Sequence, residues 1–156
     1  MSRSSISSLL VTAMLCFFSA SSDGNEDKSS DVKVELSSQK PLWLHVTVRS
    51  RAETQVTLPT WRLPWGNGNT MMLLPVDRYS QCFDNKYVAE SYPDYRKVSV
   101  DPNSSISGDI DLQKVLPGLE EALKKSDIHL FWTYEAPEQL HIARWSGGWI
   151  QIPQRR

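Results

Sequence analysis

Residues 128–135 read Ile-His-Leu-Phe-Trp-Thr-Tyr-Glu, and apolar side chains occupy at least every second position of this stretch. A period of two is that of a β-strand, in which successive side chains point to opposite faces. Ile128, Leu130, Trp132 and Tyr134 would then form a buried face, while the opposite face is mixed and only partly polar. The stretch therefore predicts a strand that packs on a core through one face.

The residues that follow predict a hairpin. Ala136-Pro-Glu138 is typical of a turn, and Leu140 and Ile142 then resume the apolar face, which would place Ile142 opposite Trp132. Gly147-Gly148 would form another turn before a last short strand. The end of the chain is thus expected to be a series of short antiparallel strands.

The same period recurs upstream of this hairpin. Further strands are expected at 32–36, 42–48, 56–58, 71–76, 95–100 and 106–112. Pro75 suits an edge or bulged strand better than a central one, because proline has no backbone N–H to donate to a neighbouring strand. One short helix is expected from Leu116 to Lys125, where leucines recur at three- and four-residue spacing. About seven or eight short strands with one short helix favour an all-β antiparallel sandwich over a parallel α/β fold.

Length and charge limit the possibilities further. A chain of 156 residues with 40% hydrophobic content can bury one core, and we expect a single domain over residues 32–153. The formal net charge of −1 provides no field that would draw the protein to nucleic acid or to acidic lipids. No nucleic-acid partner is expected.

The N-terminus predicts export. Arg3 precedes a mostly apolar stretch, and small residues follow it, which is typical of a signal peptide over residues 1–21. The apolar run is shorter than the roughly 20 residues that cross a bilayer, so no membrane span is expected. Residues 22–31 are polar and predict a flexible leader. The mature protein would be periplasmic or secreted, and lipid anchoring through Cys16 is the less favoured alternative.

Motifs for catalysis are scarce. The sequence contains no Gly-rich phosphate loop, no Gly-x-Ser-x-Gly and no His-Glu-x-x-His. An enzyme would have to use Cys82 or the histidines of the predicted strands, His45, His129 and His141. These three imidazoles could also bind zinc if they shared one surface. We favour a structural cysteine, no metal, no cofactor and no enzymatic activity.

Tryptophan is the remaining signal, with six residues in a short chain. Trp61, Trp65, Trp145 and Trp149 all lie beside turn residues, and aromatic side chains near loops can stack on sugars or anchor a protein interface. These four residues and Asn67 are the candidate binding residues. Trp61 and Trp65 are expected to form an exposed projection, and the alternative is that each tryptophan caps one end of the sandwich.

A family resemblance rests on three stretches. Leu42–Val48, Val56-Thr-Leu-Pro59 and Ser104-Ser-Ile-Ser-Gly-Asp-Ile-Asp-Leu112 resemble the pattern of small immunoglobulin-like β-sandwich domains of exported bacterial proteins. The resemblance spans Val32 to Tyr134 and implies an antiparallel immunoglobulin-like sandwich. It carries over no functional residue.

These observations together favour an exported, non-catalytic binding protein of the cell envelope. Its partner is expected to be a protein, with the chain acting as an inhibitor, an immunity-type partner or an accessory factor. The alternative is a carbohydrate-binding module that uses the loop tryptophans.

Overall fold

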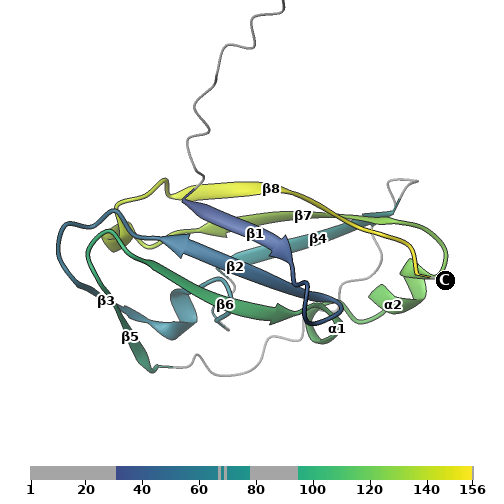
Figure 1. The fold of residues 1–156 in the computed structure, drawn as a ribbon, viewed down its shortest axis with the longest axis horizontal. Coiled ribbons are helices and arrows are strands. Elements are labelled where there is room, and N and C mark those ends of the chain that lie inside the picture. Colours follow the sequence, from purple (N-terminus) through teal and green to yellow (C-terminus); the bar gives the residue numbers. More distant parts are fainter. Residues whose placement is uncertain (1–30, 67, 69, 78–94, 156) are drawn as a thin grey trace, which may run out of the picture.

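The fold is that of a computed structural model, which describes residues 31–66, 68, 70–77 and 95–155. Within these ranges the chain forms eight strands in three antiparallel sheets and short helical segments (Figure 1). The strands are β1 (Val32–Leu36), β2 (Trp43–Arg49), β3 (Val56–Pro59), β4 (Met71–Asp77), β5 (Lys97–Val100), β6 (Ser105–Asp111), β7 (Ile128–Glu135) and β8 (Trp145–Ile152). The prediction of a mostly β, antiparallel protein is confirmed.

Two three-stranded sheets enclose the core. Their strand orders are β1-β2-β6 and β4-β7-β8, and the sheets overlap in the view of Figure 1. Alternate residues of each strand point inward, so that Leu44, Val46 and Val48 of β2 share one apolar cluster with Leu130 and Tyr134 of β7. β3 and β5 form a separate two-stranded sheet. Because the inner faces are covered, any contact with another molecule must use loops, edges or the outer faces.

The last hairpin differs from its predicted pairing. β7 pairs with β8, which places Trp132 opposite Gly148 instead of Ile142. The segment after the turn forms a 3-10 helix, η2 (Glu138–Leu140), because Leu140 turns fully into the core. Gly147-Gly148 lies inside β8 and is not a turn. A Cβ at position 148 would lie 3.1 Å from Nε1 of Trp132, so glycine makes room there for the buried indole.

One helix was expected at 116–125, whereas the structure has two short helices, one before this range and one inside it. α1 (Leu112–Val115) begins directly after β6, where the Asp111 side chain accepts a hydrogen bond of 3.0 Å from the backbone N–H of Gln113. α2 (Leu119–Leu123) follows the Pro117-Gly118 break. Leu119 and Leu123 of α2 are buried, which confirms the predicted packing face for this helix. Leu112 belongs to α1 and not to the preceding strand, where it was expected.

Residues 1–30 lie outside the described ranges, and so does the predicted signal peptide. Asp31, the last residue of the predicted leader, forms an ion pair of 2.7 Å with Arg51 and accepts a backbone hydrogen bond from Arg49. This contact attaches the start of β1 to the sheet.

Candidate functional site

The outer face of the β4-β7-β8 sheet carries large apolar side chains in contact with solvent. They come from all three strands and consist of Met72, Leu74, Phe131, Trp145 and Trp149. We call this set the aromatic face. The inner faces of the same strands supply the core, so the sheet carries large apolar side chains on both sides. An outer sheet face of this kind is unusual for a soluble β-protein, in which the outer positions are commonly polar.

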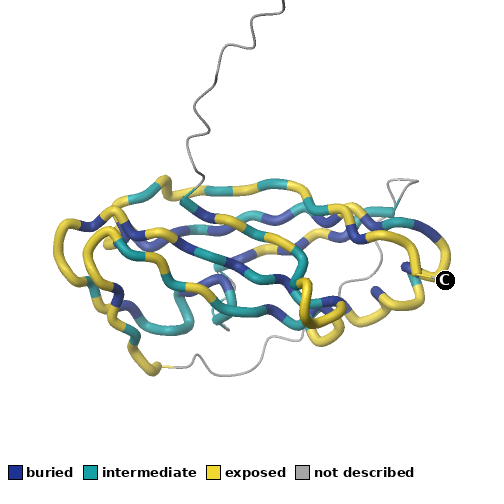
Figure 2. The backbone as a smooth tube through the Cα atoms, viewed as in Figure 1, coloured by how far each residue is buried: buried dark blue, intermediate teal, exposed yellow. Residues whose placement is uncertain are grey.

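β8 supplies the two most exposed members of the aromatic face. Trp145 is 61% exposed and Trp149 is 62% exposed, although β8 is fully paired with β7 along its length. Figure 2 shows the alternation of exposure along this strand. Gly147 lies between the two tryptophans on the same side of β8, so no side chain separates the two indoles along the strand.

Cross-strand register brings the other members next to Trp149. Leu74 pairs with Phe131, and Phe131 pairs with Trp149. The rings of Phe131 and Trp149 have centroids 4.9 Å apart and planes inclined at 48°. This tilted aromatic contact holds Trp149 against the sheet, which reduces the conformational entropy that a partner would have to remove. Met72, 54% exposed, extends the face on β4.

The aromatic face has few charges near it. The other side chains on the outer side of this sheet are those of Val76, His129, Thr133, Glu135 and Gln151. Glu135 is opposite Trp145, and its carboxylate accepts hydrogen bonds of 3.1 and 2.8 Å from Arg144. The hydrogen bonds that Arg144 donates to Glu135 raise the pKa of Arg144 above its ordinary value. Glu135 is the one carboxylate among these five residues, and it is already neutralised by an ion pair.

Trp61 and Trp65 do not form the exposed projection that was expected. Both are half-buried, and the Trp65 indole packs on the core directly over Gly108 of β6. Glycine at 108 leaves a gap in the inner face that the indole fills. Trp61 belongs to the 3-10 helix η1 (Thr60–Arg62), and its ring lies 5.3 Å from the guanidinium carbon of Arg62. The expectation of a solvent-exposed loop is wrong for this pair, and Asn67 lies outside the described residues.

The histidines do not share a surface, which contradicts the zinc alternative. His45 lies on the outer side of the β1-β2-β6 sheet, whereas His129 lies on the outer side of the opposite sheet, across the core. His141 follows η2 in a left-handed conformation, with φ of 54°. No three His, Cys, Asp or Glu side chains within the described ranges are placed to hold a metal ion. Cys82 lies outside those ranges.

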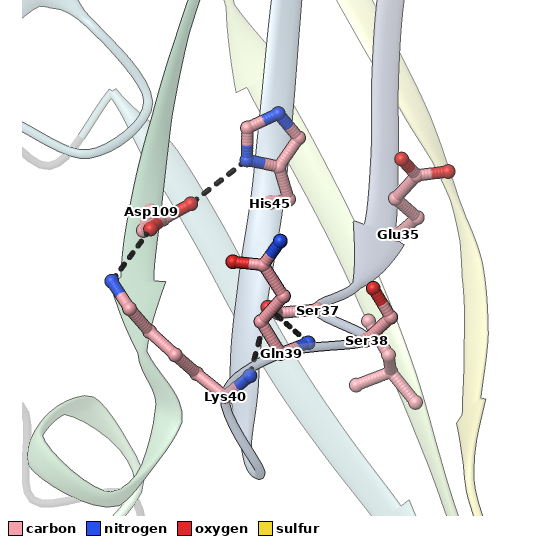
Figure 3. A pocket seen from close by; sticks show the side chains of 8 residues that line it. Glu35, Ser37, Ser38, Gln39, Lys40, His45 and Asp109 are labelled. Atoms are coloured by element: carbon pink, nitrogen blue, oxygen red, sulfur yellow. Dashed lines mark hydrogen bonds and ion pairs between the residues drawn. The ribbon is translucent and has the colours of Figure 1, made fainter.

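His45 takes part in a different arrangement that the sequence did not reveal. Its Nδ1 lies 2.8 Å from Oδ1 of Asp109, and Lys40 Nζ lies 3.0 Å from Oδ2 of the same carboxylate (Figure 3). These two hydrogen bonds, that of His45 first, hold the pKa of Asp109 below its ordinary value. Lys40 also lies 4.5 Å above the Trp43 ring.

This polar network lines a pocket of about 510 Å³ beside the loop between β1 and β2. The other lining residues include Glu35, which forms an ion pair with Lys33 outside the network. The contacts within the network attach the loop to the sheet. Holding this loop in place is a structural role that explains the network without a ligand. The aromatic face is therefore the stronger candidate for binding.

Of the five candidate binding residues, the structure brings Trp145 and Trp149 together on one exposed face and places Trp61 and Trp65 elsewhere. Sequence reasoning missed Met72, Leu74 and Phe131. The signal was present, because Met71-Met72-Leu73-Leu74 is apolar without interruption in a strand that contains an edge-type proline. A run of this kind in an antiparallel edge strand indicates that both faces are apolar.

Comparison with known proteins adds no family. Models of protein families yield no match to the chain, and curated proteins yield none. None of the helices in the described part of the chain has the length and apolar character needed to cross a membrane.

Proposed function

We propose that this chain is an exported, non-catalytic binding protein of the cell envelope that contacts another protein through the aromatic face. The observation that carries the proposal is the exposure of Trp145, Trp149, Met72 and Leu74 together on one sheet face. Contiguous apolar patches of this kind mark interaction sites on soluble proteins. Tryptophan is also the residue type most enriched among interface residues that dominate binding energy.

A protein partner is favoured over a carbohydrate by the composition of the face. Sugar binding combines stacking on aromatic rings with hydrogen bonds to hydroxyl groups, and Met72 and Leu74 can provide neither. Apolar side chains of a protein fit all five members of the face. Carbohydrate binding remains the second candidate, because Trp145 and Trp149 are exposed and held on a rigid strand.

In this proposal the scaffold is an immunoglobulin-like sandwich. Strand order supports it, since β1-β2-β6 and β4-β7-β8 correspond in chain order to the A-B-E and C-F-G sheets of that fold. The chain departs from the pattern at β5, which pairs with β3 and does not extend the first sheet next to β6. Two short helices are also inserted between β6 and β7.

The proposal is tested by site-specific photocrosslinking. A photoreactive phenylalanine analogue is placed at position 74, within the face, and in a second protein at position 95, where Tyr95 is 74% exposed shortly before β5. Both proteins are incubated with envelope extract of the producing organism. We expect discrete protein adducts from position 74 that disappear when Trp145 and Trp149 are both changed to alanine, and no such adducts from position 95.

Two results would contradict the proposal. The first is identical crosslinking from positions 74 and 95, which would show that the adducts do not depend on the face. The second is crosslinking at position 74 that survives the double substitution in a protein with unchanged melting temperature. Binding of cellohexaose or chitohexaose, detected by tryptophan fluorescence and lost in the same double variant, would instead support the carbohydrate alternative.

A further inference from the structure

The spacing of the two tryptophans on β8 matches the repeat of an extended peptide. Trp145 and Trp149 are four residues apart on one side of a strand, a distance of about 13 Å at the usual rise per residue. In an extended peptide, side chains on one side recur at about 7 Å. Three alternate side chains of such a peptide therefore span the two indoles, with the middle one above Gly147.

The exposed area of the aromatic face also suits a short segment. The two indoles, each about 60% exposed, offer roughly 300 Å² together. With Met72 and Leu74 the exposed apolar area reaches about 450 Å², within the range of functional patches on monomers. The interface of a stable homodimer buries about 1,000 Å² or more on each partner, and about 65% of this area, or roughly 650 Å², is apolar. The face is thus too small for a stable dimer with a second copy of this chain and large enough for a few residues of peptide.

Charge defines the chemistry of that segment. Glu135, the carboxylate opposite Trp145 on the outer side of the sheet, forms an ion pair with Arg144. An added charge in the ligand would lose hydration against the apolar face without gaining an opposite charge there. The ligand is therefore expected to be uncharged where it crosses the face.

On these grounds, and resting on the proposed function, we propose that the partner is bound through an uncharged, extended segment that lies along β8. It places apolar side chains at its first and fifth positions against Trp145 and Trp149, and its third side chain over Gly147. Phe131 supports Trp149 from the neighbouring strand and Leu74 widens the contact. Recognition is by side-chain contact on the sheet face and does not require pairing with a sheet edge.

The experiment is selection from a phage-displayed library of random eight-residue peptides on the purified chain, followed by titration with a synthetic peptide from the selection. We expect enriched peptides with apolar residues at alternate positions and no charge within that motif. Trp149→Ala should weaken binding of the peptide at least about 30-fold. Tyr95→Ala, which removes an exposed aromatic ring away from the face, should leave the affinity unchanged.

A second peptide, with the same composition but its apolar residues moved to adjacent positions, should bind at least about tenfold more weakly. Enrichment of charged motifs, equal binding of both peptides, or no enrichment would overturn the inference. So would self-association of the chain that Trp149→Ala abolishes, since the occupant would then be a second copy. If crosslinking from position 74 still yields face-dependent adducts while the library yields no peptide, the proposed function stands and the extended segment is wrong.

Discussion

Replacing Gly108 by alanine tests the placement of Trp65 in the core. A Cβ at position 108 would overlap the five-membered ring of the Trp65 indole, so either the indole or β6 must shift. Overpacking of this kind costs about 1–3 kcal/mol. Alanine recovers about 0.5–1 kcal/mol relative to glycine in a strand. We expect Gly108→Ala to lower the free energy of unfolding by about 1–2 kcal/mol.

A double-mutant cycle separates this clash from other effects. Trp65→Ala alone should cost about 2–3 kcal/mol, somewhat less than a fully buried tryptophan, because the residue is half-buried. In the Trp65→Ala background the methyl group at 108 enters the vacated space, so the cost of Gly108→Ala should disappear. The coupling energy is then about 1–2 kcal/mol.

Urea denaturation followed by far-UV circular dichroism measures all four proteins, since this signal reports mainly on the backbone and depends less on tryptophan than fluorescence does. Ser107→Ala is the matched control, because Ser107 neighbours Gly108 on β6 and is exposed. It should change the free energy of unfolding by less than about 0.5 kcal/mol. Strictly additive effects of the two substitutions, or a Trp65→Ala protein as stable as the parent, would show that the indole does not fill the gap over Gly108.

Three further predictions concern single residues. Asp109→Asn should reduce the loss of stability on acidification, measured as the shift in urea midpoint between pH 5 and pH 2.5. The folded-state pKa of Asp109 is depressed by His45 and Lys40, so its contribution is present above the unfolded pKa and is lost as the pH falls through the folded one. Burial raises the pKa of Tyr134, so its phenol should ionise only when alkali unfolds the chain, and an absorbance titration that shows all tyrosines ionising before unfolding would contradict its burial. Asn103 is exposed with φ of 52°, so Asn103→Ala should cost about 1 kcal/mol in chemical denaturation, and Asn103→Gly should cost almost nothing. Equal stability of the two Asn103 variants would show that the left-handed backbone is not retained.

Local pattern determined most of the strands. Alternation of apolar and polar side chains places β2 and β7 within one or two residues of their observed bounds, because period two puts every second residue on the buried face whatever the strand pairs with. Pro75 identified β4 as an edge strand for a similarly local reason, and β4 is at the end of its sheet among the described strands. These features depend on single residues and their immediate neighbours.

Only the tertiary structure decided which strand follows β7 in its sheet and where the tryptophans point. Leu140 fits the predicted alternation of a strand, but it is buried in the core from the 3-10 helix η2. The strand that pairs with β7 is β8, in which Gly148 lies opposite Trp132 and leaves space for its indole. Trp65 and Trp149 both lie beside glycines in the sequence. The Trp65 indole packs over Gly108, a residue more than 40 positions away, whereas the Trp149 side chain is exposed. The aromatic face likewise joins three strands whose register is a property of the whole sheet, because the partner of each residue is set by long-range packing and not by its neighbours in the chain.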